Sequence, residues 1–177
     1  FVALPRFLCV ISLLILVISA CESGPVDLNT LSRTATLATP RGEILRTTLA
    51  LTDAEQTRGL SGTVSSQWAA DQAMLFIYAE SAMRRFWMPD TYFDLDIFFL
   101  DGDLKIIDVE RNVKHHPGRE VPPEIVTTRT VHAQHVLEMR ADSPLSKTLA
   151  KGESLKFKSE RDLKSIVGAM KMRGAST

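Results

Sequence analysis

The sequence is poor in cysteine, since only Cys9 and Cys21 occur among its 177 residues. Two cysteines are too few for a disulfide framework. Cys9 lies inside an apolar N-terminal run, and Cys21 stands directly after that run. If the run is removed and Cys21 carries lipid, the mature chain keeps no free thiol. A thiol nucleophile, a disulfide and a cysteine-based zinc site are then all excluded.

The sequence also lacks an excess of charge of either sign, with 21 basic and 21 acidic residues. A chain with this balance has no global field that would steer it toward nucleic acid or an anionic membrane. It shows no stripe of alternating basic and aromatic residues either. We therefore expect no nucleic-acid partner.

Motifs of common catalytic and cofactor sites are missing as well. The run Gly59-Leu60-Ser61-Gly62 lacks the spacing of a nucleophile elbow, and no glycine-rich loop would cradle a phosphate. His132 and His135 are three residues apart, so on a strand their side chains would face opposite sides. We expect no metal site and no cofactor.

The N-terminus carries the pattern of an export signal. Residues 7–20 are almost wholly apolar and follow Arg6. This run is shorter than the about 20 residues of a transmembrane helix, and it ends in small residues as signal peptides do. Ile18-Ser19-Ala20-Cys21 resembles the bacterial lipobox, where a peptidase cuts before a lipid-bearing cysteine. An uncleaved signal anchor is the alternative, but this ending favours residues 1–20 as a signal peptide.

The lipobox resemblance implies a bacterial protein that is exported and anchored through acylated Cys21 at the periplasmic side of a membrane. In Gram-negative bacteria an aspartate after that cysteine commonly retains a lipoprotein in the inner membrane. Here the residue is Glu22, which favours the outer membrane. Residues 21–33 are mostly polar and small, and we expect a flexible tether there.

Short strand-like runs dominate the rest of the chain and indicate one mainly β domain over residues 34–158. Residues 73–78 are continuously apolar, as in a strand that is buried on both faces. Many short strands with turn signals between them predict a single small β-sandwich or barrel-like domain with one or two short helices. The expected strands are residues 34–38, 44–51, 73–78, 85–88, 95–100, 104–109, 136–139 and 155–157.

Turn and capping residues mark the connections. Asp101-Gly102 between two apolar runs predicts a hairpin of residues 95–100 with 104–109, closed by a turn with positive φ at both central positions. Thr52-Asp53-Ala54-Glu55 is a capping box for a helix that should end near Gly59. Ser143-Pro144 predicts the start of a second short helix, with Gly152 beyond its end.

Two segments lack the strand pattern. Residues 113–129 are rich in proline, glycine and charge, which predicts a long surface loop. Residues 159–177 form a basic C-terminal tail. Its apolar residues fall at helical spacing, so we expect either a short docking helix or a frayed end. These residues are Leu163, Ile166, Val167 and Met170.

A set of motifs between Arg58 and Phe157 resembles the domain of unknown function 192 family (DUF192). Its most specific part is Trp87-Met88 followed by Thr91 and Leu95-Asp96. Pro89-Asp90 stands where the family usually has lysine and asparagine. The resemblance implies a small, mainly β, sandwich-like domain, often exported and with no agreed activity. The motifs are Arg58-Gly59-Leu60, Met74-Leu75-Phe76, Phe86-Trp87-Met88, Thr91, Leu95-Asp96-Ile97-Phe98-Phe99, Val136-Leu137-Glu138 and Gly152-Glu153.

Asp96 is the residue that most invites a functional interpretation. Its strand is apolar on both faces, and a buried carboxylate needs a partner because an unpaired one is too costly. We favour an internal carboxylate that ties the loop of residues 87–91 to the sheet, since structural ion pairs are common. The alternative is a carboxylate that grips a ligand beside Trp87. The expected partners are Arg58, Arg84, Arg85, Thr91 and backbone amides.

Trp87 and Met88 would form an apolar pocket wall or part of the core, and we favour the core for a large aromatic beside a strand.

The sequence contains no nucleophile–base pair, so we expect a non-catalytic envelope module that binds a small ligand, a glycan or an envelope partner. The alternative is an envelope hydrolase that uses Asp96 with Glu138 or Asp94 as paired carboxylates. The candidate ligand-binding residues are Arg58, Trp87, Met88, Thr91, Asp96 and Glu138.

Overall fold

The computed structural model of the protein describes residues 26–121 and 123–175. The predicted signal peptide and the predicted lipidation site at Cys21 lie outside the described residues. So does the first part of the expected tether, residues 21–25. Within the part that is described, none of the helices has the length and apolar character needed to cross a membrane.

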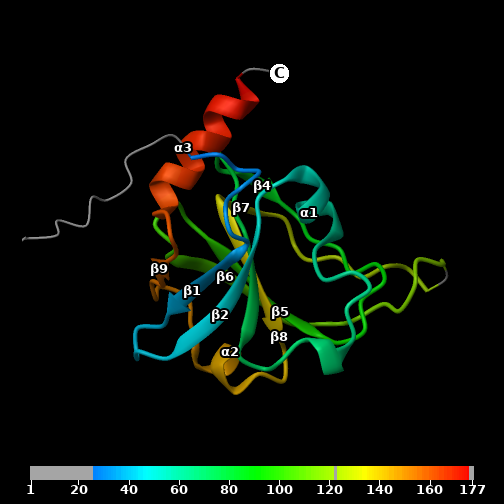
Figure 1. The fold of residues 1–177 in the computed structure, drawn as a ribbon. Coiled ribbons are helices and arrows are strands. Elements are labelled where there is room, and N and C mark those ends of the chain that lie inside the picture. The colour runs from blue at the N-terminus through cyan, green and yellow to red at the C-terminus, as the bar shows by residue number, and fades with distance from the viewer. Residues whose placement is uncertain (1–25, 122, 176–177) are drawn as a thin grey trace, which may run out of the picture.

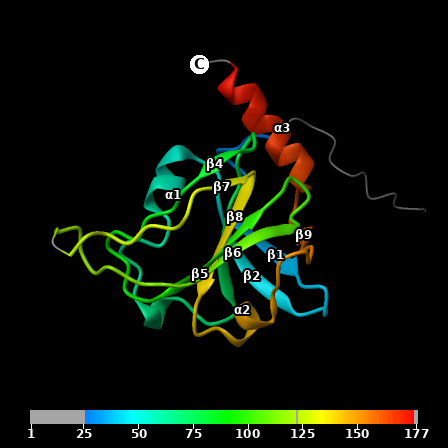
Figure 2. The same cartoon turned by 180° about the vertical axis from the view of Figure 1, so that it is seen from behind.

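A seven-stranded sheet forms the centre of the fold, in the order β6-β5-β8-β3-β2-β1-β9 (Figures 1 and 2). Neighbouring strands are antiparallel except β2 and β3, which are parallel and joined by a crossover that contains α1. The strands are β1 (Thr34–Ala38), β2 (Ile44–Ala50), β3 (Gln72–Phe76), β5 (Leu95–Leu100), β6 (Ile106–Val113), β8 (His135–Arg140) and β9 (Lys156–Lys158). A separate two-stranded sheet pairs β4 (Ala82–Arg84) with β7 (Val131–Ala133).

The main sheet curls without closing. Its two edges meet only at one end, where three backbone hydrogen bonds join residues 104–106 to residues 152–155: Ile106 N to Glu153 O (2.8 Å), Gly152 N to Ile106 O (2.8 Å) and Leu155 N to Leu104 O (3.1 Å). The prediction of a mainly β single domain is therefore confirmed. Of the two architectures considered, the barrel is not formed.

Both faces of the sheet are covered around the inner strand β5, which is buried at every position. On one face Phe98 and Leu100 belong to a core that also contains Ile166 of the C-terminal helix. On the other face Ile97 and Phe99 belong to a second core, which contains residues of the loops after α1 and after β4. Alternation along β5 thus sends successive side chains into two separate cores.

The predicted hairpin is present, since β5 pairs antiparallel with β6. Its turn differs from the expected one. Positive φ occurs at Leu104 (60°) and not at Gly102, and Leu104 N donates to Asp101 O at 3.2 Å. Leu104 is fully buried in the first core. Burial of this side chain compensates for a backbone conformation that costs a residue other than glycine about 1–2 kcal/mol.

Among the described residues, two short α-helices and one 3₁₀ turn accompany the strands of the domain, as expected, and a third helix lies in the C-terminal tail. The predicted capping box is formed, with Glu55 N donating to Thr52 Oγ1 and the Glu55 carboxylate accepting from Thr52 N. The C-terminal tail contains α3, which packs Ile166 and Ala169 against the first core. The helices are α1 (Asp53–Arg58), α2 (Pro144–Thr148) and α3 (Leu163–Gly174), and the 3₁₀ turn is Ser65–Gln67.

Two segments differ from the sequence expectations. Leu28 and Leu31 of the expected tether are buried in the first core, because apolar side chains spaced by one turn find cover there. Residues 85–88 form no strand; they make a single bridge, Trp87 with Thr127, to the long loop that connects β6 and β7. The described part of that loop, within residues 114–121 and 123–130, projects from the body of the domain (Figures 1 and 2).

Candidate functional site

Five of the six candidate residues meet at one pocket on the second-core side of the sheet. They are Arg58, Trp87, Met88, Thr91 and Glu138, while Asp96 lies elsewhere. The floor comes from β8 and β3, one wall from the end of α1 and its following loop, and the other wall from residues 86–91. The full lining is Gln56, Thr57, Arg58, Gly59, Leu60, Ser61, Phe76, Phe86, Trp87, Met88, Pro89, Thr91, Leu95 and Glu138.

Gly59 shapes the wall on the α1 side. Its φ of 49° and ψ of −132° turn the chain at the end of α1, while its N–H donates to Glu55 O at 2.9 Å. A Cβ atom at this position would lie 3.3 Å from Phe76 Cζ and 3.8 Å from Glu138 Oε2. The bare backbone therefore packs directly against the floor of the pocket, which explains the glycine in the Arg-Gly-Leu motif.

Glu138 forms the polar part of the floor. It is 4% exposed, and its Oε2 atom has no hydrogen-bond partner within the described residues. Burial raises the pKa of Glu138 to about 8, because a low-dielectric surrounding disfavours the charged form. Buried polar groups are almost always hydrogen-bonded, so an unpaired carboxyl at the bottom of a pocket requires an explanation.

Aromatic side chains surround this carboxyl. Phe76 and Phe86 pack edge to face with ring centroids 4.9 Å apart. Trp87 is 50% exposed at the rim, whereas Met88 is buried in the second core. Of the pair that we expected in the core, Met88 lies there and Trp87 does not. Sequence reasoning missed Phe76 and Phe86 as walls, although both stand inside the quoted motifs.

The wall formed by residues 86–91 is held in place by hydrogen bonds. Thr91 Oγ1 donates to Met88 O at 2.8 Å and accepts from His116 N at 2.9 Å. Ser61 Oγ donates to Pro89 O at 2.8 Å, which links this wall to the wall opposite. Thr91 is thus a positioning residue whose polar groups are already used.

The pocket is narrow and carries little charge. Its cavity volume is about 30 Å³, room for one or two water-sized groups. Arg58 and Glu138 are the only charged or titratable residues in its lining. The Arg58 side chain is exposed and makes no ion pair or hydrogen bond with any residue that the structure describes.

Asp96 lies on the opposite face of the sheet. In the pairing of β5 with β8, Asp96 faces Met139 and Ile97 faces Glu138. Directly opposed residues point to the same face and successive residues alternate, so the two carboxyl groups leave opposite faces. Asp96 and Glu138 do not share a cleft.

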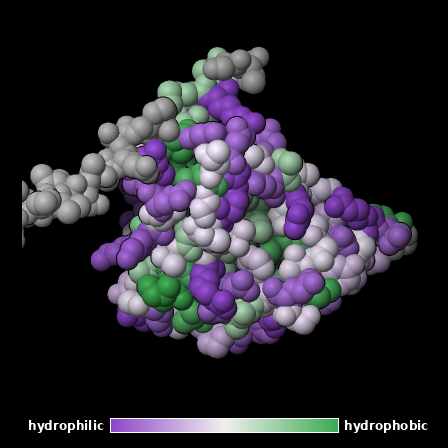
Figure 3. All heavy atoms as spheres, viewed as in Figure 1, coloured by the Kyte–Doolittle hydropathy of each residue, from purple (hydrophilic) through white to green (hydrophobic). Residues whose placement is uncertain are grey.

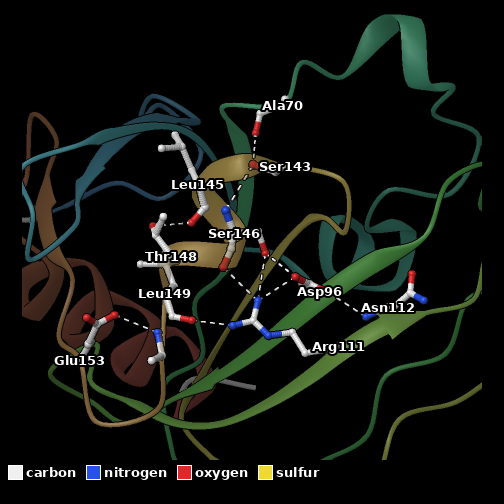
Figure 4. A network of polar contacts seen from close by, with 11 residues as sticks. Ala70, Asp96, Arg111, Asn112, Ser143, Leu145, Ser146, Thr148, Leu149 and Glu153 are labelled. Atoms are coloured by element: carbon white, nitrogen blue, oxygen red, sulfur yellow. Dashed lines mark hydrogen bonds and ion pairs between the residues drawn. The ribbon is translucent and has the colours of Figure 1, made fainter.

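A β-bulge supplies the partners of Asp96 (Figure 4). In β6 both Arg111 and Asn112 oppose Asp96, because Leu95 pairs with Val113 and Ile97 with Glu110. Asn112 N donates to Asp96 Oδ1 at 2.8 Å, and Arg111 Nη1 donates to Oδ2 at 2.7 Å. The φ of Asn112 is 54°, in the left-handed region that asparagine tolerates.

The same network fixes α2. Ser146 Oγ donates to Asp96 Oδ2 at 2.6 Å, and Arg111 also donates to the backbone oxygens of Ser146 (2.9 Å) and Leu149 (2.5 Å). Asp96 is therefore an internal carboxylate, as favoured. Of its expected partners, a backbone amide is present, that of Asn112. The expected side chains Arg58, Arg84, Arg85 and Thr91 were wrong, since Asp96 holds β6 and α2 rather than the loop of residues 87–91.

The arginines expected near Asp96 lie elsewhere. Arg84 stacks over the Tyr78 ring at 3.5 Å, and Arg85 donates to Thr127 Oγ1 at 2.7 Å. Asp94, the other carboxylate considered, accepts hydrogen bonds from Lys114 Nζ and His115 N. Partial burial opposes ionisation of Asp94, but these hydrogen bonds outweigh it and lower its pKa to about 2.

No three histidine, cysteine, aspartate or glutamate side chains in residues 26–121 and 123–175 are grouped so that they could hold a metal ion. His132 is exposed on β7 and His135 is fully buried on β8. On the face shown in Figure 3 the surface is largely hydrophilic, with hydrophobic residues in small separate patches.

Two solved bacterial structures resemble this fold. One, from Sinorhizobium meliloti 1021, is a presumed transcription regulator; it is 28% identical, covers 76% of this chain and 98% of its own, and has a TM-score of 0.55. The other is a protein of unknown function from Novosphingobium aromaticivorans DSM 12444. It is 23% identical, the match covers 78% of this chain and 96% of that protein, and the TM-score is 0.55. No curated protein matches the sequence.

A family model matches residues 36–157, which is more than half of the chain and includes every residue of the pocket. The model is that of DUF192, described as an uncharacterized ACR. The sequence resemblance, the mainly β fold and this match agree, and the chain belongs to the DUF192 family.

Proposed function

We propose that the domain is a binding module whose pocket over Glu138 receives a polar group of a small ligand or of an envelope partner. The observation that carries this proposal is the unpaired, buried carboxyl of Glu138 at the floor of an aromatic pocket. Leaving such a group without a partner costs about 1–3 kcal/mol. A ligand group that hydrogen-bonds to the carboxyl would recover that free energy, and this gain would favour binding at the site.

The paired-carboxylate hydrolase finds no support in the geometry. Catalysis of that kind needs two carboxyl groups in one cleft. Asp96 and Glu138 leave opposite faces of the sheet, and Asp94 is paired with Lys114 and His115. The pocket contains Glu138 as its only carboxyl group.

The second half of the proposal concerns location. We infer from residues 7–21 that the mature chain is exported and held by acylated Cys21 at the periplasmic side of a bacterial membrane. Labelled palmitate should enter the wild-type protein and the Cys9→Ser variant, and it should not enter Cys21→Ser. Label in Cys21→Ser would contradict the lipid anchor.

The pocket is tested by screening small polar compounds against ¹⁵N-labelled protein by NMR. Compounds that bind should shift the Trp87 indole N–H, and Trp87→Ala should weaken their binding about tenfold, the loss of one well-packed aromatic contact. Tyr92→Ala is the matched control, because Tyr92 is a second exposed aromatic and does not line the pocket. Shifts confined to other regions, or none across the set, would refute a binding role for this pocket.

A further inference from the structure

We infer that the group received by this pocket is a cation, an ammonium or guanidinium at the tip of a narrow chain. This inference rests on the proposed binding function and names the chemistry of its ligand. A free amine and a lysine or arginine side chain share that chemistry.

The carboxyl of Glu138 is the polar lining group that needs a partner. Other polar side chains around it are used within the protein: Thr91 and Ser61 donate to backbone oxygens, and Gln56 Nε2 donates to Ile77 O at 2.8 Å. A carboxyl group can accept from several donors, and an ionised one attracts positive charge. The protonated carboxyl can also donate one O–H, but the ionised form only accepts, so a ligand with several hydrogen-bond donors favours the ionised form.

The walls favour a cation over a neutral donor. Phe76, Phe86 and Trp87 line the same small space, and the faces of aromatic rings attract positive charge. Desolvation strengthens this attraction, because the electrostatic interaction is screened less away from water. An ammonium group inside the pocket would lie among these aromatic rings and next to the Glu138 carboxyl.

Within the part of the chain that the structure describes, no cationic side chain holds the Oε2 atom of Glu138. Burial raises the pKa of Glu138, and the exposed Arg58 guanidinium forms no ion pair with its carboxyl group. Tyr78 is the other titratable neighbour, since the Glu138 charge contributes to raising the Tyr78 pKa. Arg58 lies exposed at the rim, where its charge opposes an entering cation through solvent.

The volume limits the ligand to a tip. About 30 Å³ accommodates one or two groups near the size of water, such as an ammonium or the leading NH₂ edge of a guanidinium, and not a whole metabolite. The apolar stem behind the cation would then pass Trp87 and Leu60, which line the pocket. A cation bound against Glu138 favours the ionised carboxyl, so binding near pH 7 should release a proton.

The test compares four probes that each contain a four-carbon chain: n-butylammonium, n-butylguanidinium, butyramide and butyrate. Binding is followed by the ¹³C shift of the Glu138 carboxyl and by calorimetry in buffers of different ionisation enthalpy. The two cations should bind with proton release at pH 7 and should move the carboxyl signal to its ionised position. Glu138→Gln should weaken the cations about tenfold or more and leave butyramide within about twofold.

Two further variants separate charge effects. Asp103→Asn removes an exposed carboxylate that does not line the pocket, so cation binding should stay unchanged. Arg58→Gln should tighten cation binding about twofold at low salt, because a like charge at the rim is gone.

A blocked Gly-Lys-Gly peptide that binds tighter than n-butylammonium points to a polypeptide source, and one that binds no tighter points to a free amine.

The outcomes distinguish this inference from the proposed function. Butyramide or butyrate binding in the pocket more tightly than both cations would overturn the cation inference and leave the binding module standing. Cation binding that survives Glu138→Gln unchanged would also overturn it. Absence of every probe from the pocket, together with a failed compound screen, would overturn both.

Discussion

Asp96 and Glu138 lie one position apart in the register of two neighbouring strands, yet one is fully paired and the other is not. The Asp96 carboxylate accepts hydrogen bonds from Arg111, from Ser146 and from the N–H of Asn112. The Oε2 atom of Glu138, in contrast, has no hydrogen-bond partner in the described residues. The sheet separates them, because each side chain enters a different core. This contrast leads to opposite expectations for their variants.

Asp96→Asn should lower the free energy of unfolding by about 1–3 kcal/mol, because charge-assisted hydrogen bonds become neutral ones. Asp96→Ala should cost more, since the Arg111 guanidinium and the Ser146 hydroxyl then lose their common acceptor. Denaturant melts of the variants measure the change. An unchanged or higher midpoint for Asp96→Asn would contradict a structural role.

The matched control for Asp96 is Asp71→Asn. Asp71 also contacts an arginine, Arg46, at 2.7 Å, but both side chains are largely exposed. Exposed pairs contribute little because water and salt screen them. The control should leave the denaturation midpoint nearly unchanged, and a loss equal to that of Asp96→Asn would show that burial is not the deciding factor.

Glu138 should make the domain less stable as the pH rises. Burial raises the Glu138 pKa to about 8 from the ordinary 4.5. Between these values the folded state binds more protons than the unfolded state, so stability that is complete below pH 4.5 is lost as the pH approaches 8. The full loss is on the order of a few kcal/mol, and Glu138→Gln should abolish this part of the pH dependence. Melts between pH 6.5 and 8 measure it.

His135 should act in the opposite sense at lower pH. Burial, followed by the nearby Arg84 charge, lowers the His135 pKa from 6.5 to about 4. The unfolded state then binds more protons between these values, so stability is lost as the pH falls from 6.5 toward 4. His135→Asn, measured in the Glu138→Gln background, should lack this loss. An equal acid slope with and without His135 would assign the effect to other groups.

Gly59→Ala should lower stability by about 1–3 kcal/mol, because alanine disfavours the backbone conformation of this residue. The added methyl group would also sit 3.3 Å from Phe76 Cζ and disturb the pocket floor. Gly42→Ala is the control: Gly42 also has positive φ (87°), but a Cβ there meets nothing within 4 Å. If thermal melts show the same loss of stability for both variants, the contact of the added methyl group with Phe76 does not contribute to the effect.

Local sequence signals predicted the elements well. The strand at Leu95–Leu100 has the bounds expected from its apolar run, and the Thr52 capping box starts α1 as expected. These signals depend on neighbours along the chain, so a sequence alone contains them. The turn at Asp101–Leu104 departed from expectation, because the buried side chain of Leu104 decided its geometry.

The partners of Asp96 depend on register, which the sequence does not display. A bulge opposite Asp96 brings Arg111 within reach, and one residue less in β6 would send Arg111 to another position. The pocket residues were predictable only from the family motifs. These motifs named Arg58, Trp87, Met88, Thr91 and Glu138 as candidates, although the sequence does not show that they are in contact. The separation of Asp96 from Glu138 required the order of the strands.

The position of β8 has a consequence for how the chain acquires its structure. β8 lies between β5 and β3, although it follows both in the sequence. Until residues 135–140 emerge, the hydrogen-bonding edges of β3 and β5 that face each other across this gap stay open, and β5 is the apolar run Leu-Asp-Ile-Phe-Phe-Leu. Open apolar edges recruit other chains, so nascent or truncated forms that end before β8 should be prone to aggregate.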